Sequence, residues 1–105
     1  MTVRFLSVRC NMEDGKMAEL DKEYLSKLVN RAERGSAEDQ YRTGLAYALG
    51  EGVPVDLVTA HKWLNLAAMN GMDEARESRS EISHDMSPQE IAAAQKLARE
   101  WYLTH

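Results

Sequence analysis

Two glutamates and a histidine have the spacing of metal ligands on one helix face. Glu77, Glu81 and His84 lie at positions i, i+4 and i+7 of a polar segment, so a helix would place them on one side. Carboxylates and imidazoles are zinc ligands, and three protein ligands suffice for a catalytic zinc. The spacing therefore allows a small metal-dependent hydrolase. We favour the simpler interpretation of a solvated helix face, because the sequence places no fourth ligand, and we expect neither metal nor cofactor.

A glycine-rich stretch raises the separate question of phosphate binding. Gly50-Glu51-Gly52-Val53-Pro54 lacks the Gly-x-x-x-x-Gly-Lys-Ser/Thr pattern of a P-loop, and Val55 stands where a dinucleotide-binding loop has its third glycine. Gly50 and Gly52 are better explained as turn residues with positive φ, and Pro54 stiffens the exit from the turn. We expect this stretch to turn one helix onto the next.

Two further reactive side chains lack the partners that catalysis needs. His61 stands beside Trp63 on an otherwise apolar segment, and no nucleophile or carboxylate is placed within reach of it by local spacing. Cys10 lies in an N-terminal segment that we expect to be a flexible tail, where no base could be held beside it. The sequence therefore predicts a protein that is not an enzyme.

Composition narrows the class of partner. The chain has 105 residues and a net charge of -4, which suits a single domain. Residues 36–105 contain six basic and eleven acidic residues, so their surface would repel nucleic acid. A single cysteine excludes an internal disulfide, and no apolar run is long enough for direct membrane insertion. We expect a cytoplasmic protein.

Apolar spacing and capping signals predict five helices and no strand of useful length. The first runs over 17–32 after a tail of residues 1–16, and Gly35 ends it. Ser36, Asp56 and Ser87 have the residue types of N-caps, and Ser87-Pro88-Gln89-Glu90 is typical of a capping box. The second and third helices end at Gly50 and Gly71, the fourth covers about 73–83, and the fifth follows Ser87.

The expected inward positions follow the helical period. They are Ala37, Tyr41, Gly44, Leu45 and Ala48 in the second helix, then Leu57, Ala60, Leu64, Ala67 and Ala68 in the third. Gly44 costs a helix about 1 kcal/mol relative to alanine, which indicates close approach of a neighbouring helix at this point. The later stripes are Ala75, Ser78 and Ile82, followed by Ile91, Ala94, Leu97, Ala98 and Trp101.

Two halves of the chain show a weak internal repeat. Gly35 and Gly71 lie 36 positions apart, and aligning 32–43 with 68–79 matches Ala32 with Ala68 and Glu38 with Glu74. Combined with the alternation of helices and short turns, this indicates stacked helical hairpins, each too small to bury its apolar face alone.

The order of small, turn and aromatic residues resembles a known family. The residues are Ala37-Glu38-Asp39-Gln40-Tyr41, Gly44-Leu45-Ala46-Tyr47, Gly50-Glu51-Gly52-Val53-Pro54, Asp56, Ala60, Trp63, Ala67-Ala68 and Gly71. Together they are similar to one Sel-one-like repeat, a relative of the tetratricopeptide repeat, over about 36–71. Partial or degenerate repeats flank it within a helical domain of residues 17–105. The resemblance implies a short right-handed α-α superhelix of about five antiparallel helices, a solenoid that binds proteins.

A concave protein-binding face is the functional expectation. In stacked hairpins the first helix of each pair tends to line this face, and its non-core positions here include Thr43 and Ala46. We predict a non-enzymatic scaffold that binds a protein or peptide, because tyrosine, arginine and acidic groups are frequent in interfaces. The residues assigned to this site are Asp39, Arg42, Tyr47, Glu77 and Glu81.

The first helix poses a question of its own. Its stripe from Met17 to Ala32 packs on the next helix, and the opposite side faces the position of a missing hairpin. An exposed apolar face normally finds a cover. Two covers are considered, a homodimer through this helix or the tail residues Val3, Phe5, Leu6 and Val8.

Overall fold

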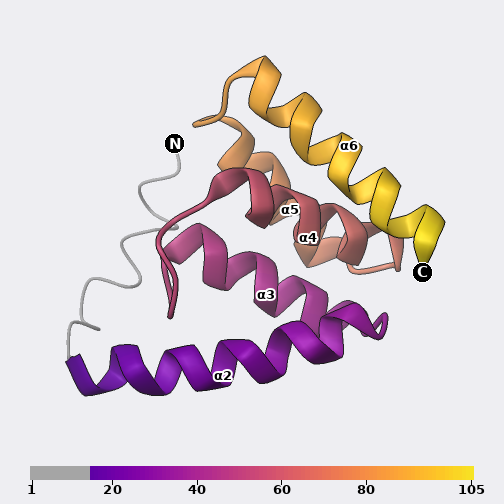
Figure 1. Cartoon of the computed structure of the whole chain (residues 1–105). Helices are drawn as coiled ribbons and strands as arrows, with labels where there is room; N and C mark the ends of the chain where they lie inside the picture. Colours follow the sequence, from indigo (N-terminus) through magenta and orange to yellow (C-terminus); the bar gives the residue numbers. More distant parts are fainter. Residues whose placement is uncertain (1–14) are drawn as a thin grey trace.

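The computed structural model describes the backbone of residues 15–105 and the side chains from Lys22 onward. Consecutive helices run in alternating directions (Figure 1). No strand occurs in residues 15–105, which confirms the expected all-α class. The tail residues, Cys10 among them, lie outside the described part of the chain. The helices are α2 (Gly15–Glu33), α3 (Ala37–Leu49), α4 (Leu57–Met69), α5 (Asp73–Ser83) and α6 (Pro88–Thr104).

The predicted N-caps start three of these helices. Ser36 Oγ accepts a hydrogen bond from the backbone N of Asp39 at 3.3 Å, and Asp56 Oδ1 accepts from Thr59 N at 3.2 Å. Ser87 and Glu90 form a complete capping box, with Pro88 in the first turn of α6. These bonds satisfy backbone donors that have no partner inside the helix.

The glycine-rich stretch is a turn between α3 and α4, as predicted. Gly50 and Gly52 have φ angles of 77° and 81°, which only glycine adopts without strain. The backbone N of Asp56 donates to the carbonyl of Tyr47 at 3.0 Å, so the turn closes onto the end of α3.

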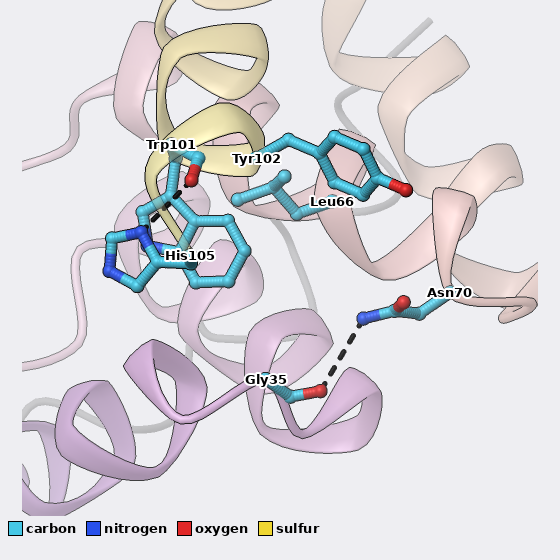
Figure 2. Close-up of a pocket in the computed structure, with 6 residues that line it drawn as sticks. All are labelled: Gly35, Leu66, Asn70, Trp101, Tyr102 and His105. Atoms are coloured by element: carbon cyan, nitrogen blue, oxygen red, sulfur yellow. Dashed lines mark hydrogen bonds between the residues drawn. The ribbon is translucent and has the colours of Figure 1, made fainter.

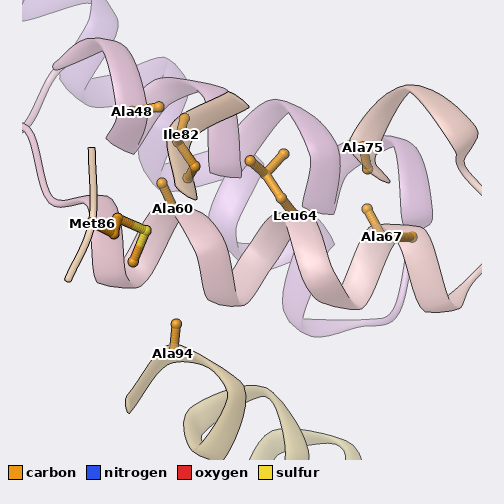
Figure 3. Close-up of a cluster of buried hydrophobic side chains, with 9 residues drawn as sticks. Ala48, Ala60, Leu64, Ala67, Ala75, Ile82, Met86 and Ala94 are labelled. Atoms are coloured by element: carbon orange, nitrogen blue, oxygen red, sulfur yellow. The ribbon is translucent and has the colours of Figure 1, made fainter. Parts of the chain in front are cut away.

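The core is built around α4, which packs against α3, α5 and α6. Figure 3 shows α4 with side chains from the neighbouring helices pointing at it. Alanine dominates this core, so the helix backbones lie close together and the core contains little bulk per residue. The cluster comprises Ala48, Ala60, Leu64, Ala67, Ala68, Ala75, Ile82, Met86 and Ala94.

Gly44 lies at the closest approach of α3 and α4. A Cβ atom added there would stand 2.7 Å from Leu64 Cγ and 3.1 Å from the carbonyl oxygen of Ala60. The close approach expected from sequence is therefore present. Ala60 and Leu64 both belong to the inward stripe predicted for the third helix.

The buried faces of α3 and α6 differ from the predicted stripes. Thr43 and Ala46 were assigned to an accessible surface but are buried, because α3 packs against α2 as well as against α4. Leu97 was expected in the core but is 40% exposed, because α6 makes its main contact with α4 alone and buries a narrow stripe on Ala94 and Ala98.

Candidate binding surfaces

Two of the predicted binding residues, Glu77 and Glu81, line a groove along α5. Its remaining lining comes from Arg76, Ser78 and Ser80, and its volume is about 460 Å³. Arg76 is 3.9 Å from Asp73 in an exposed i,i+3 pair, which contributes little to stability. The groove therefore presents both hydrogen-bond donors and acceptors, with an excess of carboxylates.

The metal-site alternative gains no support from this groove. His84 is exposed, and its Nδ1 lies 3.0 Å from the carbonyl oxygen of Ser80 on its own helix. Within the described residues, no group of three or more histidine, cysteine, aspartate or glutamate side chains could hold a metal ion.

Arg42 and Asp39 lie at the contact between α2 and α3. Arg42 Nη2 is 2.8 Å from Glu38 Oε2, and its Nη1 donates to Tyr24 Oη at 3.4 Å. The bond to Tyr24 and then the bond to Glu38 raise the pKa of the guanidinium. Asp39 Oδ2 is 3.2 Å from Arg31 Nε. Arg42 through Tyr24 and Asp39 through Arg31 thus connect α3 to α2. Neither residue lines the α5 groove.

Tyr47 lies at a third place on the surface, separate from the α5 groove and from the Arg42 and Asp39 contacts. It is half-buried and lines a hollow of about 310 Å³ between α2 and the turn. The five residues assigned to one concave site are therefore distributed over the α5 groove, the α2–α3 contact and this hollow. The other residues that line the hollow are Lys22, Leu25, Ser26, Val29, Asn30, Gly52 and Val53.

His61 is a core residue. Its side chain is 3% exposed, and its Nδ1 has no hydrogen-bond partner among the described residues. Burial, and secondarily the positive charge of Arg79, lower the pKa of His61. The lowered pKa favours the neutral form of the imidazole, and its Nδ1 is bonded to neither a nucleophile nor a carboxylate of the described residues.

A hollow of about 400 Å³, which no sequence pattern indicated, lies where three helices end. It is lined by Gly35, Leu66, Asn70 and the α6 residues Trp101, Tyr102 and His105 (Figure 2). Of these aromatic residues, Trp101 was expected on the inward stripe of the last helix, and Tyr102 and His105 were not assigned to the core. The available signal was the clustering of Trp101, Tyr102 and His105 at the very end of the last helix.

Glu33 of α2 connects this hollow to the end of α6. Its Oε1 accepts a hydrogen bond from Trp101 Nε1 at 2.9 Å and lies 3.1 Å from His105 Nε2. The His105 ring stacks on Trp101, with centroids 4.1 Å apart and planes 9° apart. Trp63 meets the Trp101 ring edge-on, with the two ring centroids 5.9 Å apart. We call Glu33, Trp101, Tyr102 and His105 the aromatic corner.

The exposed face of α2 is mostly polar between residues 22 and 33. Tyr24 is the one large apolar side chain there that is clearly exposed. The apolar face that motivated a homodimer through Met17–Ala32 is thus absent from this described part, and the homodimer stays a prediction. None of the helices in residues 15–105 combines the length and apolar character needed to cross a membrane.

Comparisons with family models, with curated proteins and with solved structures found no match to this chain. The similarity to Sel-one-like repeats therefore rests on the residues quoted above.

Proposed function

We propose that this protein is a non-enzymatic interaction module of the helical-repeat type, which binds a segment of a partner protein along α5. The observation that carries the proposal is the groove lined by Arg76, Glu77, Ser78, Ser80 and Glu81. Its mixed donors and acceptors suit the polar groups of a polypeptide, and its two carboxylates favour a segment with basic side chains.

The organisation of the fold supports this proposal. The core is rich in alanine and is held by α4, so α5 is fixed from one side through Ala75 and Ile82. The groove follows the remaining surface of α5, and Ser78 lies at its boundary with this buried stripe. Small helical bundles can recognise a partner through one rigid helix face. The resemblance to Sel-one-like repeats points to the same class of function.

The test is affinity purification from source cells, with partners quantified for the native protein and for a Glu77→Lys, Glu81→Lys variant. We expect at least one partner to be captured by the native protein and lost with the variant, because charge reversal repels a basic segment. The purified partner should then bind the native protein directly.

A Glu23→Lys, Glu100→Lys variant is the matched control. It reverses two exposed carboxylates that do not line the groove. The proposal fails if both variants retain the same partners, or if both lose them equally while remaining folded.

A further inference from the structure

We propose that the aromatic corner, together with the hollow beside it, binds an arginine side chain of a partner polypeptide. This second site is separate from the α5 groove and does not depend on the function proposed for that groove.

Three helix C-termini meet at the hollow. Gly35 follows the end of α2, Asn70 is the C-cap of α4, and residues 101–105 form the end of α6. All three ends lie on the same side of the molecule (Figure 1). Each helix C-terminus carries a partial negative charge that favours cations over anions. The backbone alone therefore gives this hollow a partial negative charge that favours a cation.

The polar side chains around the hollow leave acceptors for a ligand. Asn70 Nδ2 already donates to the carbonyl of Gly35 at 3.4 Å and to Gln40 Oε1 at 3.1 Å, so the remaining polar atom of this side chain is an acceptor. Trp101 Nε1 donates to Glu33. The side-chain N–H donors of Asn70 and Trp101 are therefore engaged, while the Glu33 carboxylate keeps 43% of its surface exposed.

The chain itself already binds nitrogen-bearing groups in this way. His105 lies flat on Trp101 with Nε2 at Glu33, and its Nδ1 is 2.9 Å from the Trp101 carbonyl oxygen. Lys62 Nζ lies 4.4 Å from the centroid of the adjoining Trp63 ring, a cation–π distance. A planar ring stacked on an indole and paired with a carboxylate shows the contacts that a guanidinium would repeat.

Arginine fits this combination better than lysine. A guanidinium is planar, stacks on aromatic rings and carries five N–H donors, whereas an ammonium is a compact and strongly hydrated charge. Tyr102 is 58% exposed beside the hollow, which offers a second aromatic surface. A volume of about 400 Å³ accommodates one side chain and part of its backbone.

The test is an NMR titration of the full chain with the peptide Gly-Gly-Arg-Gly-Gly, blocked at both ends. Its citrulline analogue has nearly the same shape without the charge and serves as the matched ligand. We expect the Trp101 indole N–H and Tyr102 ring signals to shift, with the citrulline peptide binding about tenfold more weakly.

Two variants that are expected to change the affinity for the arginine peptide in opposite directions make the test specific. Glu33→Gln keeps an acceptor for Trp101 but removes the charge, so it should weaken arginine binding about tenfold. Lys62→Met removes a competing cation from the same cluster and should strengthen binding severalfold. Glu23→Gln on the same helix and the groove variant Glu77→Lys, Glu81→Lys should leave binding unchanged.

The inference is overturned if the arginine and citrulline peptides bind equally, or if residues 33–35, 62–70 and 101–105 show no shift at about 10 mM peptide, whatever happens at the α5 groove. It is also overturned if Glu33→Gln and Lys62→Met, both verified as folded by thermal unfolding, change the affinity in the same direction.

Discussion

Gly44 lies in the middle of α3 at a point where a methyl group has no room. We expect Gly44→Ala to lower the free energy of unfolding by about 1–2 kcal/mol, because contact with Leu64 and the Ala60 carbonyl outweighs the gain of about 1 kcal/mol in helix propensity. Urea denaturation of both proteins measures the difference. In a Leu64→Ala background the same change should cost less, since the nearest atoms are gone. A stabilising Gly44→Ala would contradict the close packing.

His61 makes stability depend on pH. Because burial lowers its pKa in the folded protein, the unfolded chain binds the proton first as the pH falls below about 6.5. The stability present above that pH is then lost progressively, by up to about 1.4 kcal/mol per pH unit, until the folded pKa is reached. Denaturation curves between about pH 7.5 and pH 5.5 measure this slope.

The matched variants for this prediction are two histidine replacements. His61→Leu should flatten the slope over this range, whereas His84→Gln at an exposed position should leave it in place. An unchanged slope in His61→Leu would assign the pH dependence to other groups.

Individual site residues were only partly predictable from sequence. The amphipathic period indicated which residues belong to helices but not how many neighbours each helix has, so Thr43 and Ala46 were assigned to a surface that α2 and α4 cover. Likewise, the period could not show that Trp101 extends from the core into a hollow. Its hydrogen-bond partner Glu33 is 68 positions away in the chain.

At the scale of elements, the capping box of α6 is the most local determinant of the fold. Ser87→Ala should lower stability by about 1 kcal/mol, because the backbone donor of Glu90 loses its acceptor. Ser87→Asp keeps an acceptor and should retain most of the stability. Thermal unfolding of the three proteins provides the comparison, and equal melting temperatures for the native protein and Ser87→Ala would show that the cap is not needed.

Helix boundaries were predictable because their signals lie within four residues of each end. Ser36, Asp56 and Ser87 cap the helices expected of them, and Asp73–Ser83 forms the fourth predicted helix. The packing of α6 was less accessible to prediction. Leu97 follows the inward period, yet no described helix beyond α4 makes an extensive contact with α6 to cover it.

At the scale of the whole molecule, Gln40 joins the ends of α2 and α4. It is fully buried, its Nε2 donates to the Ala32 carbonyl at 3.2 Å, and its Oε1 accepts from Asn70. Sequence reasoning gave this residue no structural role, because its partners are 8 and 30 positions away. A glutamine in an amphipathic helix is usually exposed.

The loss of this link should destabilise both α2 and α4. Gln40→Met preserves the approximate size of the side chain but removes its bonds to the Ala32 carbonyl and to Asn70, which should cost about 1–3 kcal/mol in total. The Ala32 carbonyl still accepts from Gly35 N at 3.0 Å. Gln95→Met, the same change at an exposed position of α6, should alter stability by less than about 0.5 kcal/mol. Hydrogen exchange separates a global from a local effect, because a link between hairpins should accelerate exchange in α2 and α4 together. Faster exchange confined to α3 would instead show that Gln40 stabilises its own helix and that the helix ends are held by other contacts.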